Sequence, residues 1–399
     1  MKKILSIAAI LLCVMACKQK ATDGFVIDGT LNGSKAENAI VKLYDAADMN
    51  MTVVDSAVVS KDGHFQLKGK VEEPAMYQVQ IELADPALSE QERTLAYAFY
   101  IENAPMTFTA DVETMPTVFY IPGRKTVNPV ITGSPTQELN EKISTQLAEK
   151  ENQLADLGQQ LAQVYGDSAE QNSEATLKSI GIQNLMESLR KECDEIRTEF
   201  IRQHAASVVA LDQALLLTYS EALTAKDFDD ILALLEPTWK GKPRFEELKK
   251  QMEVKKHMAR GSTLPDADFL TPDGKTVSLH SVLPKEGYTL VEFWASWCGP
   301  CRAEMPHLKQ IAAKYPAFHI VSVSVDDDDA PWQQALEQEK LTWTQLRSPD
   351  GFQGTAQRVY GLMGVPACYL VDAEGKIVRG EARGPVLDKL LSELYGEKK

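Results

Sequence analysis

Residues 293–302 read FWASWCGPCR, in which Cys298 and Cys301 are separated by Gly-Pro. The segment overlaps the nearly all-apolar run from Leu290 to Trp294, which is typical of a buried central strand. We expect a helix to begin at Cys298, where the helix dipole and unpaired backbone N–H groups favour an anion. That position lowers the pKa of a thiol below its ordinary value of about 8.5. Because the thiolate is the species that attacks disulfides, the pattern predicts redox chemistry at a cysteine pair.

The two cysteines have different expected roles. Cys298 lies nearer the open end of the helix and is the expected nucleophile. Cys301 follows one helical turn later, close enough to attack a mixed disulfide at Cys298 and to release the reduced substrate. Cys301 is therefore the expected resolving thiol.

Other uses of this spacing are disfavoured. A zinc site needs four ligands, and no second Cys-x-x-Cys or His pair accompanies the motif. Haem attachment requires a histidine where the chain has Arg302. A purely structural cystine remains as an alternative, although cross-linking so short a loop gains little stability. We expect no metal and no cofactor other than the redox-active disulfide.

Residues 261–399 alternate expected strands and helices. Strands are expected at 289–294, 319–325, 342–346, 367–371 and 376–379, and helices from 298, at 331–339, at 354–360 and from 386. This alternation is typical of an α/β domain with a central sheet.

Two further parts precede this domain, so the chain is expected to be multidomain. Residues 24–131 alternate apolar and polar residues in short runs between turn signals such as Asn32-Gly33, which predicts an antiparallel β-sandwich-like domain. Residues 135–258 carry apolar residues at helical spacing, which predicts a helical middle segment with a helix pair joined near residues 166–168.

The composition excludes some classes of function. The 399 residues are 44% hydrophobic and 25% charged, as in an ordinary globular protein. The formal net charge of -15 opposes nucleic-acid binding, because neutralising phosphates requires a dense basic face.

The first 17 residues have the pattern of an export signal. Lys2 and Lys3 precede an apolar stretch that is too short to span a membrane. The stretch ends in Val-Met-Ala-Cys, which resembles a bacterial lipobox and predicts that Cys17 receives a lipid and becomes the first mature residue. Ordinary cleavage near Ala16, which leaves a free Cys17, is the alternative. The sequence therefore predicts a lipoprotein of the cell envelope.

Two other side chains and one acidic run need an interpretation. Cys193 lies on an apolar stripe at helical spacing and is expected in the core. His307 follows a proline on the expected active helix and is expected at the surface. The acidic run from Asp326 to Asp329 lacks the glycine and distal glutamate of a calcium loop, so we expect a loop with helix-capping acids.

The C-terminal third of the chain resembles the thioredoxin-fold proteins of the membrane-anchored TlpA/ResA type. The motifs that carry the resemblance are FWASWCGPCR at 293–302, Glu-Met-Pro at 304–306, Gly-Val-Pro at 364–366, and Leu-Val-Asp at 370–372 with Gly375. The β-rich start and helical middle resemble the N-terminal region of unknown function of many Bacteroidetes lipoprotein thioredoxins. The resemblance implies a thioredoxin-like fold and protein-disulfide oxidoreductase activity.

The resemblance also implies a substrate-binding surface. Pro366 matches the proline that is cis in thioredoxins and lies against the active disulfide, where backbone is exposed for a substrate strand; an ordinary edge proline is the alternative. The residues implied to contact substrate are Trp297, Gly299, Pro300, Val365 and Pro366.

Glu292 matches the buried aspartate that in thioredoxin accepts a proton from the second cysteine. A carboxylate within an apolar strand is costly unless it is functional or paired, and burial should raise its pKa toward neutrality. That pKa suits a base that deprotonates Cys301. The alternative is a glutamate turned to solvent at the end of the sheet.

The chain departs from thioredoxin at three places. No lysine occurs in the neighbouring expected strand at 320–325, so proton handling around Glu292 is expected to differ. Ala367 replaces the usual threonine after the proline, and Cys368 follows it. Cys368 is interpreted as a small buried hydrophobic residue, with a third redox thiol as the alternative.

The predicted function is disulfide reduction in exported proteins by a periplasm-facing lipoprotein, at the outer membrane rather than the inner. The resemblance implies a membrane electron donor of the DsbD/CcdA kind as a partner. A thiol peroxidase is disfavoured, because the peroxiredoxin motif needs Pro and Thr or Ser where the chain has Val291 and Ala295. A surface binding or scaffold lipoprotein with an auxiliary redox domain is the other alternative.

Overall fold

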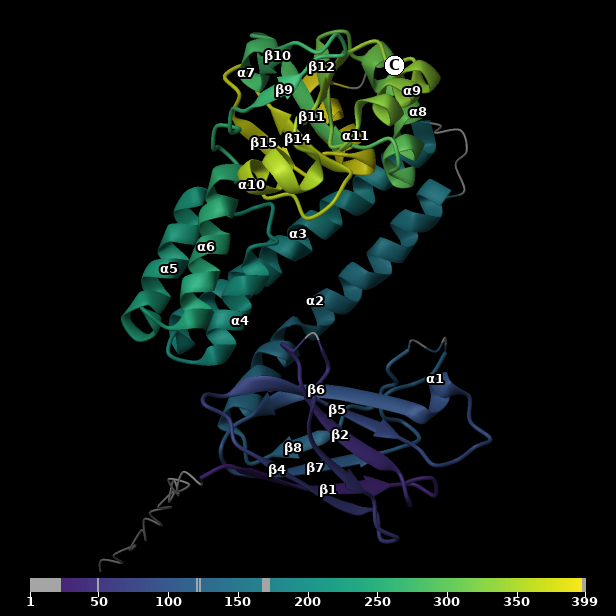
Figure 1. The fold of residues 1–399 in the computed structure, drawn as a ribbon, viewed down its shortest axis with the longest axis vertical. Helices are drawn as coiled ribbons and strands as arrows, with labels where there is room; N and C mark the ends of the chain where they lie inside the picture. The colour runs from purple at the N-terminus through teal and green to yellow at the C-terminus, as the bar shows by residue number, and fades with distance from the viewer. Residues whose placement is uncertain (1–22, 49, 120, 122, 167–172, 397–399) are drawn as a thin grey trace, which may run out of the picture. The chain divides into compact units, whose positions relative to one another are not determined.

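A computed structural model describes residues 23–396 except 49, 120, 122 and 167–172. The predicted signal peptide, Cys17 and residues 167–168 of the predicted helix connection lie outside the described residues. The chain divides into two compact units, Met1–Lys142 and Ile143–Lys399, which are treated in turn (Figure 1).

The first unit contains two four-stranded sheets, the purple and blue arrows of Figure 1. One has the strand order β4-β1-β7-β8 and the other β3-β2-β5-β6. Alternate residues of β1 are buried, and they form with residues of both sheets a single hydrophobic core, as a sandwich requires. The elements are β1 (Phe25–Asn32), β2 (Ile40–Asp45), β3 (Val53–Val58), β4 (His64–Gly69), β5 (Ala75–Glu82), α1 (Glu90–Arg93), β6 (Thr94–Ile101), β7 (Pro105–Asp111) and β8 (Val130–Thr132).

The predicted β-sandwich-like domain is confirmed with one difference in strand direction. The strand pairs are antiparallel except β1 with β7, which run parallel from Val26 opposite Pro105 to Asn32 opposite Asp111. Turn signals predict only pairings between neighbouring strands of the chain. The β1–β7 pairing joins segments that are distant in the chain. It is favoured because it buries the apolar face of each of these two strands in the same core.

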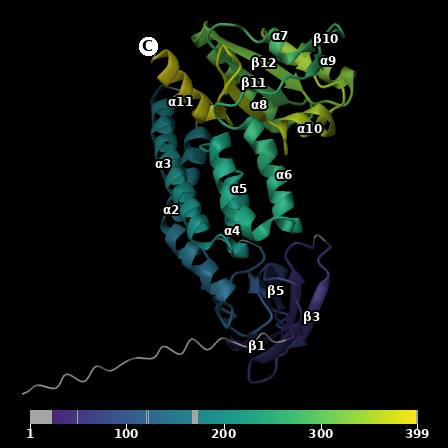
Figure 2. The same cartoon turned by 90° about the vertical axis from the view of Figure 1, so that its left-hand side faces the viewer.

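The second unit begins with the helical middle segment that the sequence predicts. Its helices are α2 (Pro135–Gly166), which starts in the first unit, α3 (Ser173–His204), α4 (Val208–Leu217), α5 (Ala225–Trp239) and α6 (Pro243–Met258). Ser207 and Thr224 begin α4 and α5 as N-caps, each accepting a backbone N–H three residues later. α5 and α6 lie side by side (Figure 2). Among the described residues, no helix has both the length and the apolar character needed to cross a membrane.

The rest of the second unit is an α/β domain with the thioredoxin-like fold that the resemblance implies. Its seven-stranded sheet has the order β10-β9-β13-β12-β11-β14-β15, so β11 is an interior strand. β11 pairs parallel with β12 and antiparallel with β14. The elements are β9 (Asp268–Leu270), β10 (Thr276–Ser278), α7 (Leu279–Val282), β11 (Tyr288–Trp294), α8 (Gly299–Lys314), β12 (Phe318–Ser324), α9 (Asp329–Glu339), β13 (Thr344–Arg347), a π-helical turn (Phe352–Ala356), α10 (Gln357–Tyr360), β14 (Ala367–Val371), β15 (Ile377–Gly380) and α11 (Gly384–Tyr395).

The helical segment is attached to the α/β domain within this unit through α3. Glu187 accepts hydrogen bonds from Arg379 Nη1 at 2.7 Å and binds Lys389 Nζ at 3.1 Å, so one carboxylate joins α3 to β15 and α11. Beside this contact lies a cavity of about 680 Å³, lined by residues of α3, of 216–222 and of 379–386 and by Glu304. The α/β domain is therefore held by the helices on the side of its β15 edge.

Candidate active site

Cys298 and Cys301 are joined by a disulfide at the start of α8, with their Cα atoms 5.3 Å apart. Cys298 is the N-cap residue, and the backbone N–H of Cys301 points to its Sγ atom at 3.2 Å. Cys301 is fully buried, whereas Cys298 retains 4% exposure. An N–H aimed at the sulfur at a helix start is the arrangement that stabilises a thiolate.

The loop before β14 lies against the same sulfur. The Val365–Pro366 peptide bond is cis, as the resemblance implies, and the Val365 carbonyl oxygen is 3.6 Å from Cys298 Sγ. Trp297 beside the pair is 64% exposed, and Gly299 and Pro300 are exposed as well. The predicted substrate-contacting residues therefore surround the more exposed cysteine.

Met363 lies in the same loop as Val365 and Pro366 and was not predicted. Its side chain is 85% exposed, two residues before Val365. Together with Trp297 it places exposed apolar side chains on both chain segments that approach Cys298. A methionine in a loop has no periodicity that marks it, so only the exposure of the folded chain identifies it.

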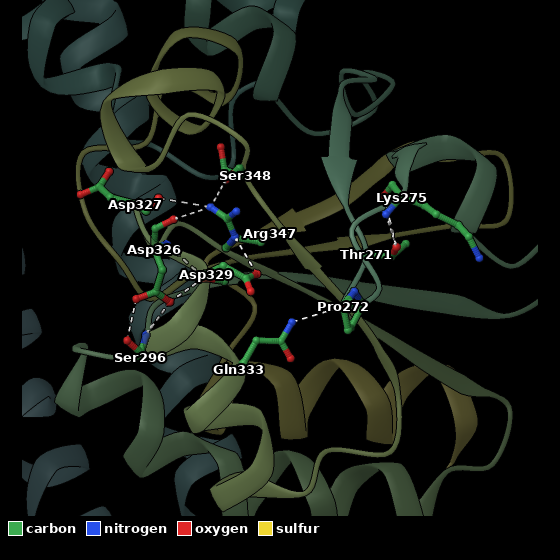
Figure 3. Close-up of polar contacts among 11 residues, drawn as sticks. Thr271, Pro272, Lys275, Ser296, Asp326, Asp327, Asp329, Gln333, Arg347 and Ser348 are labelled. Atoms are coloured by element: carbon green, nitrogen blue, oxygen red, sulfur yellow. Dashed lines mark hydrogen bonds and ion pairs between the residues drawn. The ribbon is translucent and has the colours of Figure 1, made fainter.

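The loop that leads from β11 to Cys298 is held by Asp326, as Figure 3 shows. The Asp326 carboxylate is 2% exposed and accepts from Ser296 N–H at 2.9 Å, Ser296 Oγ at 2.6 Å and Ser324 Oγ at 2.6 Å. Arg347 Nη1 donates to the Asp326 carbonyl oxygen at 3.3 Å. These bonds fix the backbone two residues before Cys298.

The sequence predicts that the run from Asp326 to Asp329 is a loop with helix-capping acids, and the structure agrees only in part. Asp328 is the N-cap residue of α9, but its side chain makes no capping hydrogen bond. Asp326 is instead a buried acceptor for the active-site loop. Its partner Ser296 is 30 residues away, and no local pattern marks such a pairing.

Glu292 is buried in β11 with 1% exposure, so the alternative of a solvent-facing glutamate is wrong. Burial raises its pKa from 4.5 to about 7, against the hydrogen bond that Ser322 Oγ donates to Oε2 at 2.7 Å. The Glu304 carboxylate raises it further. Glu292 Oε1 is equally buried and has no hydrogen-bond partner among the described residues. A carboxyl group in this state exchanges its proton near neutral pH.

Glu292 lies in the middle of a row of polar side chains across three strands. In the parallel pairing of β11 with β12 it is opposite Ser322, and in the antiparallel pairing with β14 it is opposite Cys368. Residues at matched positions of neighbouring strands project from the same face of a sheet. The row therefore places a hydroxyl, a carboxyl and a thiol side by side beneath the surface.

Cys368 is 2% exposed, as its interpretation as a small buried residue predicts. Burial raises the pKa of its thiol well above the ordinary value, and the nearby Glu292 carboxyl adds to the effect. A thiol in this environment stays protonated and unreactive at neutral pH. Cys193 is likewise buried in α3, as predicted.

His307 is buried, so the prediction of a surface residue is wrong. It is 7% exposed and lies between two carboxylates, with Nδ1 2.8 Å from Glu304 Oε1 and Nε2 2.9 Å from Asp388 Oδ1. Burial alone would lower the pKa of His307, but the two carboxylates raise it to about 9. Asp388 comes from α11, 81 residues later, which is why a pattern local to α8 did not predict this environment.

We expect His307→Gln to lower the free energy of unfolding at pH 7 by about 3 kcal/mol, because it leaves the buried Asp388 carboxylate and the partly buried Glu304 carboxylate without their cation. The pKa of His307 rises on folding from 6.5 to about 9. Its stabilising effect is therefore complete below pH 6.5 and is lost as the pH rises through 9. Urea unfolding of wild type and variant at several pH values measures this.

The control is His257→Gln, which changes an exposed histidine of α6. It should leave the free energy of unfolding almost unchanged at every pH. If His307→Gln shows the same pH dependence of stability as wild type between pH 6.5 and 9, the proposed cationic state of His307 is wrong.

Metal ligation has no support in the part of the chain that the structure describes. No cluster of three or more His, Cys, Asp or Glu side chains there is arranged to hold a metal ion. The Asp326 and Glu292 carboxylates instead accept hydrogen bonds from Ser296 and Ser322.

Two protein-family models match the chain. Residues 259–388 match the Redoxin family, which covers the α/β domain and the cysteine pair. Residues 25–140 match DUF4369, a domain of unknown function, which covers the β-sandwich.

Known thiol-disulfide proteins are similar to the C-terminal part. The DsbE homologue of Paracoccus denitrificans, a thiol:disulfide interchange protein, is 29% identical over 32% of this chain and 68% of its own length. The thiol-disulfide oxidoreductase ResA of Oceanobacillus iheyensis is 32% identical over 30% of this chain. That match spans 60% of ResA, less than two thirds of its length.

A solved structure, the thioredoxin domain of a thiol-disulfide oxidoreductase from Bacteroides vulgatus, is 32% identical to this chain. The match covers 34% of this chain and 98% of that one, with a TM-score of 0.32. The Redoxin match and the similarity to DsbE and ResA both fall on the domain that holds the cysteine pair. The chain is therefore a TlpA/ResA-like, thioredoxin-fold thiol-disulfide oxidoreductase that carries a DUF4369 domain at its N-terminal end.

Proposed function

We propose that this enzyme reduces disulfides in exported proteins, with Cys298 as the nucleophile. The observation that carries the proposal is the position of Cys298: it caps α8, receives the Cys301 N–H, and borders an exposed surface formed by Trp297 and the loop of Pro366. This combines an activated sulfur with a place for a substrate chain.

The reaction is a pair of thiol-disulfide exchanges. The Cys298 thiolate attacks one sulfur of the substrate disulfide, forms a mixed disulfide and releases the other substrate sulfur as a thiolate. Cys301 then attacks Cys298 Sγ, which restores the Cys298–Cys301 disulfide and releases the second substrate thiol. Two electrons pass from the enzyme to the substrate, so the enzyme must be reduced again after each turnover.

Glu292 is the proposed base for the second exchange. Cys301 is fully buried and must lose its proton before it attacks. A carboxyl group with a pKa of about 7, on the strand that leads to the cysteine pair, is suited to accept that proton and give it up again.

The substrate is proposed to bind as an extended segment beside the cis-proline loop. Val365 and Pro366 would present backbone to it, while Trp297, Gly299 and Pro300 would contact the residues around its cysteine. Exposed apolar side chains next to a reactive sulfur favour unfolded or flexible protein substrates over small-molecule disulfides.

The cell envelope is the proposed location. The N-terminal sequence supports export, lipid attachment at Cys17 and a periplasm-facing position, at the outer membrane rather than the inner. In that oxidising compartment a reductase needs a supply of electrons, and a membrane donor of the DsbD/CcdA type is the proposed partner. Mass spectrometry of the mature N-terminus tests the lipid.

Replacing Cys301 with serine should trap the substrates. The first exchange still occurs in Cys301→Ser, but the mixed disulfide at Cys298 can no longer be resolved. We expect adducts of exported proteins, visible on non-reducing gels and identified by mass spectrometry after reduction. Their number should exceed that of wild type about tenfold or more, since resolution is the step removed.

The control is the double variant Cys298→Ser/Cys301→Ser, which should form no adducts. If Cys301→Ser forms none either, the chain does not act on exported disulfides through Cys298. A binding or scaffold role with an auxiliary redox domain would then be favoured.

A further inference from the structure

The hydroxyl of Ser322 is part of a directed chain of hydrogen bonds that ends on Glu292. Ser322 Oγ donates to Glu292 Oε2 at 2.7 Å and accepts from Trp343 Nε1 at 2.8 Å. Ser322 is fully buried, and Trp343 is half-buried just before β13. The three residues come from β11, β12 and the segment leading into β13, three neighbouring parts of one sheet.

The chemistry of the three groups fixes the direction of this chain. An indole N–H can only donate a hydrogen bond, so Trp343 occupies an acceptor position of the Ser322 oxygen. The single hydroxyl proton of Ser322 is then free to point to Glu292 Oε2. A proton on Oε2 would compete with it, so the arrangement keeps Oε2 unprotonated and puts the carboxyl proton on Oε1.

We propose that Ser322 is a positioning residue: its hydroxyl, directed by Trp343, binds Glu292 Oε2 and leaves Oε1 as the oxygen that carries and exchanges the proton. Oε1 is the Glu292 oxygen that is buried without a partner. In thioredoxin the strand next to the buried carboxylate carries a lysine, whereas here the neutral pair of Ser322 and Trp343 interacts with Glu292. It supplies a fixed dipole in place of a charge, and a dipole favours the carboxylate less strongly than an ammonium group does.

The other groups that face Glu292 do not provide this function. From α8, the Glu304 carboxylate opposes ionisation of Glu292, and Glu304 is itself held by His307 and the Gly384 N–H. From β14, Cys368 lies opposite Glu292 with a thiol that stays protonated at neutral pH. Ser322 is therefore the group around Glu292 that favours its carboxylate form.

The test is a titration of Glu292 by carboxyl ¹³C NMR in the oxidised protein, where the bridged cysteines do not titrate. The Glu292 signal is assigned by its loss in Glu292→Gln. We expect Ser322→Ala to raise the Glu292 pKa by about one unit, a tenfold increase in proton affinity. Ser322→Thr keeps the hydroxyl and should restore the wild-type value. Trp343→Phe should shift the pKa in the same direction by less.

Ser348→Ala is the matched control. It removes another fully buried serine hydroxyl that donates to a carboxylate, in this case Asp350 at 2.8 Å, and it should leave the Glu292 titration unchanged. An unshifted Glu292 pKa in folded Ser322→Ala overturns the proposal. If Ser322→Ala does not fold, an unshifted pKa in Trp343→Phe overturns it.

The effect of Ser322 on catalysis rests on the proposed role of Glu292 as the base. A second measurement distinguishes the positioning role of Ser322 from the base role of Glu292. In stopped-flow experiments, the pH midpoint of mixed-disulfide resolution should move upward with the Glu292 pKa in Ser322→Ala. If the NMR pKa moves and the midpoint does not, Ser322 positions Glu292 but Glu292 is not the base. If Glu292→Gln slows resolution while Ser322→Ala shifts neither value, Glu292 is the base and Ser322 has no positioning role.

Discussion

Cys298→Ser is expected to abolish the acceleration of insulin reduction by dithiothreitol that the wild-type enzyme should show. A serine hydroxyl forms no thiolate at neutral pH and no disulfide, so the first exchange cannot take place. We expect the catalysed part of the rate to fall about a hundredfold or more, to the level of dithiothreitol alone. The turbidity that the precipitating insulin chain produces measures the rate.

Cys193→Ala is the matched control for the loss of a thiol. Cys193 is as buried as the active pair but lies in α3, and its variant should reduce insulin at the wild-type rate. If Cys298→Ser still accelerates the reaction, another sulfur is the nucleophile. Cys301, whose thiol is no longer bridged in this variant, is then the residue to replace next.

Glu292→Gln is expected to change activity and stability in opposite directions. Without its carboxyl group Cys301 loses a proton acceptor, and we expect resolution of the mixed disulfide at pH 7 to slow about a hundredfold. The pKa of Glu292 rises on folding from 4.5 to about 7. A raised carboxyl pKa means that wild type loses stability as the pH rises from 4.5 through 7, whereas the glutamine variant does not.

The free energy of unfolding of Glu292→Gln should therefore rise relative to that of wild type as the pH increases. Between pH 4 and a pH above 8, the difference between the two proteins should change by about 3 kcal/mol in favour of the variant. Urea unfolding measures it, and single-turnover kinetics measure the resolution step. Glu286→Gln, which changes an exposed glutamate shortly before β11, should alter neither quantity. Unchanged turnover of Glu292→Gln across neutral pH would show that Glu292 is not the base.

The two largest predicted effects on activity concern Glu292 and Cys298, which lie in one short segment. Buried side chains from other parts of the domain hold this segment and the helix that follows it in place. Asp326 holds the loop before Cys298, and the Glu304–His307–Asp388 cluster joins α8 to α11.

The sequence by itself determined the features that depend on contacts between near neighbours in the chain. The apolar run of β11, the helix start at Cys298 and the burial of Glu292 follow from residues 290–301, and the structure bears them out. The spacing of apolar residues likewise predicted the β-rich, helical and α/β parts of the chain. Periodicity and capping are local, so a single sequence displays them.

Only the tertiary structure decided the features that depend on partners far away in the chain. Ser322 reaches Glu292 because β12 pairs with β11, Trp343 reaches Ser322 because β13 pairs with β12, and His307 is buried because α11 brings Asp388 to α8. The parallel pairing of β1 with β7 has the same origin. Ser322 and Glu292 are 30 positions apart in the chain, and His307 and Asp388 are 81 apart. A local pattern does not specify contacts between residues so far apart, because only the packing of the folded chain brings them together.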